Sequence, residues 1–74
     1  MQIHISLHGV FRIGRFKLET RTYPDGTLAQ NIIDDLQIPA TLLGIVLIND
    51  LHAGPDTELH DGDTLMLLPL LEGG

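Results

Sequence analysis

The sequence predicts an α+β domain in which a mixed sheet of four to five strands is covered on one face by a single helix. Three observations support this fold class. The 74 residues are enough for one domain with a small hydrophobic core. Apolar and polar residues alternate near the N-terminus, as they do in a half-buried strand, and adopt helical spacing further along. Clusters of Pro, Gly, Asn and Asp separate these segments.

A β-hairpin is predicted at the N-terminus. Its first strand covers residues 2–8, and the apolar members of this strand share one face: Ile3, Ile5 and Leu7. A turn over residues 9–14 leads to a second, more polar strand over residues 15–23. The side chains of the second strand that are expected to point inward are Phe16, Leu18 and Thr20.

A helix is predicted after the break at residues 24–26, which read Pro-Asp-Gly. Thr27 is the expected N-cap, and Gln30 three residues later completes a capping box. The apolar face of the helix consists of Leu28, Ile32, Ile33 and Leu36. Pro39 is expected to end the helix, because the residue before a proline is biased away from the α conformation.

The second half of the chain predicts three further strands. The short apolar run over residues 45–48 is typical of a strand that is buried, or nearly buried, on both faces. Asn49-Asp50 forms a turn, and His52 is expected in a short edge strand. The Asp-Gly-Asp turn at residues 61–63 precedes the most hydrophobic strand, over residues 64–71.

The last strand carries apolar side chains on both of its faces. One set consists of Leu65, Leu67, Pro69 and Leu71, and the other of Met66, Leu68 and Leu70. A single helix covers only one face of a sheet, so one set is expected to remain exposed beside the C-terminus. Such apolar patches commonly mark partner surfaces, although loops could also cover this one. The pattern does not decide which set faces outward.

Charge and composition exclude several classes of protein. The net charge is −6, and all four basic residues precede position 22. An acidic chain repels phosphate backbones, which argues against a nucleic-acid partner, and its acid-rich C-terminal half should be attracted to a basic partner surface. Cysteine is absent, which excludes disulfides, thiolate metal sites and a cysteine nucleophile. No signal-peptide pattern or membrane-spanning run is present, so we expect a cytoplasmic protein with no membrane partner.

The remaining candidate side chains do not form a catalytic or metal site. His4 and His8 share a strand face, but four residues of strand separate them by roughly 13 Å, too far to hold one metal ion. His52, in the predicted short edge strand or its turn, and His60, in the loop before residue 61, are isolated from the other histidines. No nucleophile lies at a recognisable spacing from a base, and we therefore predict no catalytic residue and no metal.

The chain ends in Gly73-Gly74. Two glycines form a thin and flexible tip that contributes nothing to a core, and such a tip suits delivery of the terminal carboxylate into a narrow enzyme cleft. A frayed terminus is the alternative interpretation. We therefore expect residues 1–71 to form a single domain and residues 72–74 to form a flexible tail.

The C-terminal third carries a further pattern of motifs. It consists of Ile48-Asn49-Asp50, Leu59, Asp61-Gly62-Asp63, an apolar strand over residues 65–68, Pro69-Leu70-Leu71, and Gly73-Gly74. This pattern resembles the ubiquitin-like sulfur carriers of the MoaD/ThiS type, and Pro69 before the tail makes it closer to the small subunit of molybdopterin synthase. Asp50 and Leu70 depart from the family, which has Gly and a second Pro at these positions. The resemblance implies a ubiquitin-like β-grasp fold.

The resemblance also implies a function. A ubiquitin-activating-type enzyme would adenylate the Gly74 carboxylate with ATP, and a sulfurtransferase or other sulfur donor would convert it to a thiocarboxylate. The acceptor would be an enzyme such as the large subunit of molybdopterin synthase. Gly73 and Glu72 would form the tail, and the expected partner-binding residues are Met66, Leu68, Pro69, Leu70 and Leu71. The carrier itself would be non-catalytic and bind no cofactor, since its partner uses the ATP.

Two alternatives remain open at this point. The same tail chemistry could end in an isopeptide bond to lysine, as in a ubiquitin-like protein modifier. The chain could instead be a β-grasp interaction module whose terminal glycines are incidental. The sequence also leaves open which biosynthetic pathway receives the sulfur.

Overall fold

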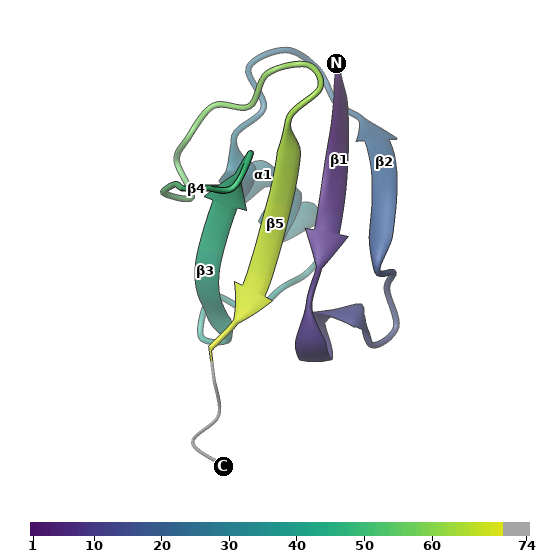
Figure 1. The fold of residues 1–74 in the computed structure, drawn as a ribbon, viewed down its shortest axis with the longest axis vertical. Helices are drawn as coiled ribbons and strands as arrows, with labels where there is room; N and C mark the ends of the chain where they lie inside the picture. The colour runs from purple at the N-terminus through teal and green to yellow at the C-terminus, as the bar shows by residue number, and fades with distance from the viewer. Residues whose placement is uncertain (71–74) are drawn as a thin grey trace.

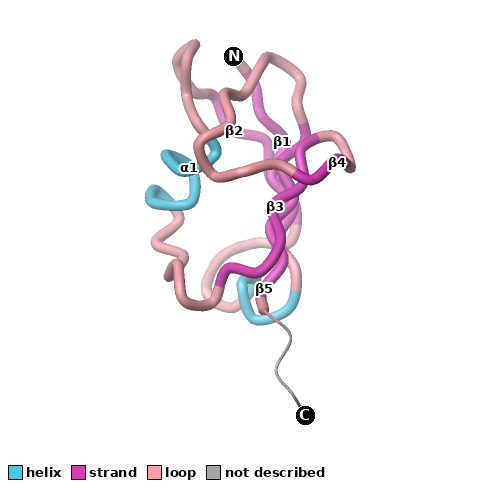
Figure 2. Tube along the Cα trace, turned by 90° about the vertical axis from the view of Figure 1, so that its left-hand side faces the viewer, coloured by secondary structure: helices cyan, strands magenta, loops and turns pink. Residues whose placement is uncertain are grey.

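The computed structural model describes residues 1–70 and contains a five-stranded mixed sheet with one α-helix (Figure 1). The elements in chain order are β1 (Gln2–Leu7), the 3₁₀ helix η1 (Gly9–Arg12), β2 (Leu18–Thr22), α1 (Ala29–Asp35), β3 (Leu43–Ile48), β4 (Leu51–His52) and β5 (Thr64–Pro69). The strand order is β2-β1-β5-β3-β4, in which β1 and β5 are parallel and the other neighbours antiparallel. The helix lies on one face of the sheet, which confirms the predicted fold class (Figure 2).

The hydrophobic core lies between α1 and the sheet. It consists of Ile3, Ile5, Leu7, Phe11, Ala29, Ile32, Ile33, Leu36, Ile38, Val46, Leu59, Leu65 and Leu67. All but one of these side chains are aliphatic, in keeping with the near absence of aromatic residues in the sequence. Each fully buried Leu or Ile stabilises the fold by about 1.5–3 kcal/mol relative to its exposed state. The parallel pair β1 and β5 contributes the inner faces at the centre of this core.

The second strand was predicted with the wrong length and the wrong face. Leu18 pairs with Ser6 and is exposed on the sheet face opposite the helix. Thr20 lies on the same face, where its hydroxyl is 2.8 Å from Nδ1 of His4. Phe16 does pack against the core, but it does so from the connection before the strand. The alternation of inward and outward side chains therefore does not continue from Phe16 into β2.

The start of α1 also differs from the prediction. Leu28 is the N-cap, whereas Thr27 is buried and donates its hydroxyl to the carbonyl of Pro24 at 2.7 Å. The capping partner is Asn31 instead of Gln30, because the backbone N–H of Leu28 donates to Oδ1 of Asn31 at 2.8 Å. Leu28 has no side-chain acceptor for the first helical N–H groups, and these donate to carbonyls in the loop that follows β4.

The helix ends at Asp35, earlier than Pro39 would impose. Gln37 adopts a left-handed conformation with φ of 57°, which terminates the helix before the proline is reached. The free carbonyls at this end are satisfied by Arg15, which donates from Nε to Leu36 at 2.9 Å and from Nη2 to Gln37 at 3.0 Å. A side chain distant in sequence thus caps the helix.

The third strand is not buried on both faces, as the apolar run had suggested. Val46 faces the core, whereas Ile45 and Leu47 face the side of the sheet that lacks a helix. The pairing with β5 is irregular around Gly44, where the two backbones approach closely. A Cβ atom on Gly44 would lie 2.9 Å from the carbonyl carbon of Pro69. The apolar run therefore belongs to a strand that has one face on the core and one face without a covering helix.

The two predicted turns in the second half are confirmed. Asn49 and Asp50 both have positive φ, 53° and 68°, as a two-residue type I′ hairpin requires. The amide of Asn49 donates to Asp63 at 2.8 Å and accepts from the backbone N–H of Thr64 at 3.0 Å. Gly62 has φ of 87° and occupies the position of the Asp-Gly-Asp turn that needs a glycine. The side chain of Asn49 thus joins this hairpin to the start of β5.

Candidate functional site

The sheet face opposite α1 is not covered by any other element of residues 1–70 (Figure 2). In the register of the sheet, Met66 lies between Ser6 of β1 and Leu47 of β3. Leu68 lies opposite Ile45. Four apolar side chains therefore form a contiguous surface, here called the open-face patch: Ile45, Leu47, Met66 and Leu68. These side chains are exposed or half-buried, which makes the patch a candidate docking surface.

The structure decides which set of the last strand faces outward. Leu65 and Leu67 are completely buried beneath the helix. Met66 and Leu68 are partly accessible, and Leu70 is exposed. The prediction that one set remains accessible is confirmed, and the set is the one with even residue numbers. Its role in partner binding stays a prediction.

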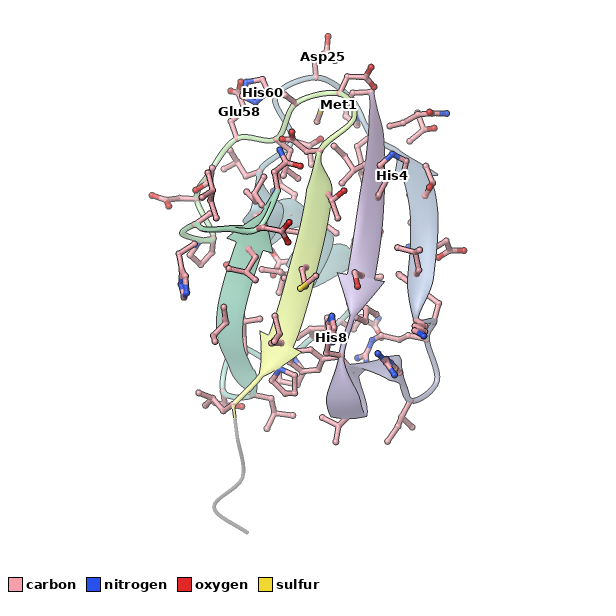
Figure 3. The ribbon with its side chains drawn as sticks, in the orientation of Figure 1. Met1, His4, His8, Asp25, Glu58 and His60 are labelled. Atoms are coloured by element: carbon pink, nitrogen blue, oxygen red, sulfur yellow. The ribbon has the colours of Figure 1, made fainter. Side chains whose placement is uncertain are left out.

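Polar side chains border the open-face patch on the side of β1. Figure 3 shows His4 along β1 and His8 just beyond its C-terminal end. Nε2 of His8 lies 3.3 Å from the hydroxyl of Ser6, so these side chains interact with each other next to Met66. His4 is engaged with Thr20 and is not paired with His8. The two imidazoles form a polar border to the apolar patch.

The end of β5 is held from both sides. On one side, the backbone of Gly9 in η1 lies against Pro69, since a Cβ atom there would be 3.1 Å from Cγ of the proline. On the other side, the backbone N–H of Leu70 donates to the carbonyl of Leu42 at 2.8 Å. Figure 2 shows η1 beside the end of β5. The predicted partner residues Pro69 and Leu70 therefore lie at an end of the sheet that η1 and the segment before β3 both contact.

A polar groove lies between β2 and the C-terminal end of α1, with a volume of about 300 Å³. Arg21 donates to Glu19 at 2.9 Å and to Asp35 at 3.4 Å, and its guanidinium lies 5.1 Å from the centre of the Phe16 ring. The hydrogen bond to Glu19 raises the pKa of Arg21. Burial raises the pKa of Tyr23, whose hydroxyl donates to Asp35 at 3.3 Å. These charged groups pair with one another, and the groove lacks the nucleophile–base arrangement of a catalytic site.

Four predicted site residues lie outside the described part of the chain: Leu71, Glu72, Gly73 and Gly74. Among residues 1–70, no three acidic, His or Cys side chains gather closely enough to hold a metal ion. Within the same residues, no helix has the length and apolar character needed to cross a lipid bilayer.

Several exposed apolar residues were not predicted from the sequence. Ile45 and Leu47 were assigned to a strand buried on both faces, and the pairing with β5 was needed to place them outward. Val10 and Ile13 lie in a segment predicted only as a turn, yet both are exposed. Apolar residues three positions apart in a turn are a signal that could have indicated η1 and its outward face.

No protein-family model matches this chain, and neither does any curated protein sequence. Solved structures do match. SAMP1 from Haloferax volcanii superposes with a TM-score of 0.78 at 18% identity, with 100% of both chains covered. A putative molybdopterin converting factor, subunit 1, from Pyrococcus furiosus has a TM-score of 0.78 at 18% identity, covering 96% of this chain and 99% of its own.

A third match comes from a protein–protein complex of subunits 1 and 2 of the molybdopterin-converting factor from Helicobacter pylori. Its TM-score is 0.67 at 22% identity, and both chains are covered over 100% of their length. Likeness at such identities establishes the fold. The chain has the ubiquitin-like β-grasp fold seen in these structures, as the sequence pattern had predicted.

Proposed function

We propose that this protein is a cytoplasmic sulfur carrier whose C-terminal Gly74 carboxylate is adenylated and then converted to a thiocarboxylate. The observation that carries the proposal is the likeness, over 96% of this chain, to a putative molybdopterin converting factor, subunit 1. The sequence adds Gly73-Gly74 shortly after the last strand of that fold. We take molybdopterin-type cofactor synthesis as the first candidate pathway.

The proposed chemistry needs no catalytic side chain from the carrier. A carboxylate is a poor electrophile, so an activating enzyme of the ubiquitin-activating type would join it to the α-phosphate of ATP and release pyrophosphate. A sulfur nucleophile on a donor protein would then displace AMP from the acyl group. The attacking sulfur would be the outer sulfur of a persulfide on the donor, so the product is an acyl disulfide. A second thiol would then attack the donor's inner sulfur, which forms a disulfide on the donor and releases the thiocarboxylate on Gly74. Recognition, and not catalysis, is the task of this chain.

The open-face patch supports a docking role in this scheme. Ile45 and Leu68 offer apolar area next to the end of β5, and the sheet presents it without a covering layer among residues 1–70. The Helicobacter pylori neighbour was solved as a complex of its two subunits, which supports a large-subunit acceptor as one partner. The activating enzyme would be another, because it must hold the carrier while the tail reacts.

Mass spectrometry of the intact protein tests the proposal. The chain is incubated with the activating enzyme encoded by the same genome, ATP and a sulfur donor. We expect a mass increase that equals replacement of one oxygen by sulfur, and fragmentation should place it at Gly74. Omitting ATP is the control. An unchanged carboxylate would contradict the carrier function, and a lysine-linked conjugate would instead favour the protein modifier.

A further inference from the structure

We propose that the end of the sheet around Leu70 is a second contact surface, distinct from the open-face patch, and that the mouth of the enzyme receiving Gly74 covers it. We call it the exit surface, and it consists of Val10, Ile13, Leu42 and Leu70. The enzyme mouth that fits it is apolar, with acidic groups at its rim. This inference rests on the proposed function, because it requires Gly74 to enter an enzyme site.

The length of chain beyond Leu70 makes this contact necessary. Four residues, 71–74, follow it. A fully extended chain spans at most about 3.6 Å per residue, so the Gly74 carboxylate reaches no further than about 14 Å from Leu70. The walls of a narrow site that binds this carboxylate must therefore contact the residues that surround Leu70.

The exit surface has the composition of a contact surface. Its members expose 52% (Val10), 74% (Ile13), 40% (Leu42) and 55% (Leu70) of their area, and they are four of the seven large exposed apolar residues in residues 1–70. Scattered apolar residues are normal on protein surfaces, but a concentration at one end of a small domain is not. Water covering these side chains would be released by an apolar partner.

The exit surface is also pre-organised. Phe11 is buried in the core and anchors η1, which leaves its neighbour Val10 pointing away from the core. The backbone N–H of Ile13 donates to the carbonyl of Val10 at 3.1 Å. Leu42 and Leu70 are joined by their backbone hydrogen bond. Because the residues are already held in place, a partner gains the apolar contact with little ordering cost.

Charge distinguishes this end of the molecule from the opposite one. Arg12 is exposed in η1, the 3₁₀ helix whose Gly9 lies against Pro69 at the end of β5. Lys17 is exposed too, but β1 separates it from β5, because its carbonyl accepts from the backbone N–H of Leu7 on the side of β2. Figure 3 shows Asp25 and Glu58 at the other end, where β5 begins. Asp25 and Glu58 thus place negative charge at the end of the domain opposite the exit surface. A complementary enzyme mouth would carry acidic groups facing Arg12.

The apolar part of the proposal is tested by Val10→Asp and Leu42→Asp, with Leu51→Asp as the matched control. Leu51 lies on β4 and is 73% exposed, so the control places the same charge on a comparable apolar site outside the exit surface. The readout is kcat/KM for ATP–pyrophosphate exchange by the cognate activating enzyme. We expect a loss of about tenfold or more for both exit-surface variants, because an unpaired charge would be buried in the contact, and less than about twofold for the control.

The charged part is tested by Arg12→Glu against Glu58→Lys, with thermal unfolding to show that each variant is folded. We expect a lower kcat/KM for Arg12→Glu, mainly through KM, and no loss for Glu58→Lys. If the wild-type chain is activated but the exit-surface variants match their controls, this inference is overturned and the carrier function stands. If the wild-type chain is not activated at all, the result contradicts both the proposed function and this inference.

Discussion

The backbone N–H of Leu70 donates a 2.8 Å hydrogen bond to the carbonyl of Leu42, where the segment before β3 meets the end of β5. The backbone of Gly44 lies against the same place, because a Cβ atom there would be 2.9 Å from the amide nitrogen of Leu70. These contacts hold the end of β5 in one position relative to the open-face patch. For an enzyme that binds the patch, the position of Leu70, after which residues 71–74 follow, is therefore fixed.

Gly44→Ala should lower the free energy of unfolding by about 1–3 kcal/mol, since the added methyl group meets backbone atoms that cannot turn away. Gly54→Ala is the control. Its Cβ would lie 2.8 Å from Oδ1 of Asp56, the free end of an exposed side chain that can rotate. Neither glycine has the left-handed φ that would add strain. Urea denaturation measures both variants, and equal losses would contradict the close approach at Gly44.

Leu67 and Leu68 are adjacent in sequence but lie on opposite faces of β5. Substitutions at Leu67 should mainly lower the free energy of unfolding, and those at Leu68 should mainly lower the affinity for a partner. Leu67→Ala should lower the free energy of unfolding by about 2–5 kcal/mol, because it opens a cavity in the core. Leu68→Ala should cost less, as its side chain is only half-buried.

The partner-binding half of this prediction uses Leu68→Asp. We expect a folded protein with weaker affinity for its acceptor or activating enzyme, because a charge replaces apolar area in the contact. Calorimetric titration against the partner provides the measurement, and far-UV circular dichroism confirms the fold. Unchanged affinity would show that the open-face patch is not the docking surface.

Local patterns in the sequence predicted those elements whose structure is set locally. Strict alternation located β1, and the Asn49-Asp50 and Asp-Gly-Asp turns were predicted because Asn, Asp and Gly are turn-forming residues. Elements that depend on distant partners were predicted less well. The face of β2 follows from its register with His4 and Ser6, which alternation within a polar segment does not reveal.

The helix and the candidate site show the same limit. Asn31 replaces Gln30 as the capping partner because the N-cap is Leu28, one residue later than predicted. The first helical N–H groups donate to the loop after β4. Arg15 caps the other end from a turn 21 residues away. The two-residue alternation of β5 divides its side chains into two sets, either of which could face outward. Only the position of α1 shows which set is buried. The exit surface could not be predicted from the sequence, because it combines Val10 with Leu70, which are distant along the chain.

Stability should fall in alkaline solution through the ionisation of Tyr23. Burial, the largest cause, raises the pKa of Tyr23 above its ordinary value of 10.0. The folded state therefore holds this proton more tightly than the unfolded state does. The resulting stabilisation is complete below about pH 10 and is lost as the pH rises through the folded-state pKa. Tyr23→Phe should remove this part of the pH dependence, which denaturation between about pH 9 and 11 would measure. Parallel curves for the two proteins would contradict the shift.

Deleting Gly74 should abolish activation and leave the fold intact. Every residue of the hydrophobic core lies between Ile3 and Leu67, so the free energy of unfolding should not change. The new carboxylate would stop about 3.5 Å short of the position that the activating enzyme presents to the α-phosphate of ATP. Such a displacement is large on the scale of an aligned attack, where reacting atoms lie about 3–3.5 Å apart. Asp25→Asn, which keeps the chain length and lies at the opposite end of the molecule, is the control and should be activated normally. Pyrophosphate exchange measures both variants, and activation of the shortened chain at the wild-type rate would show that the enzyme does not read the position of this carboxylate.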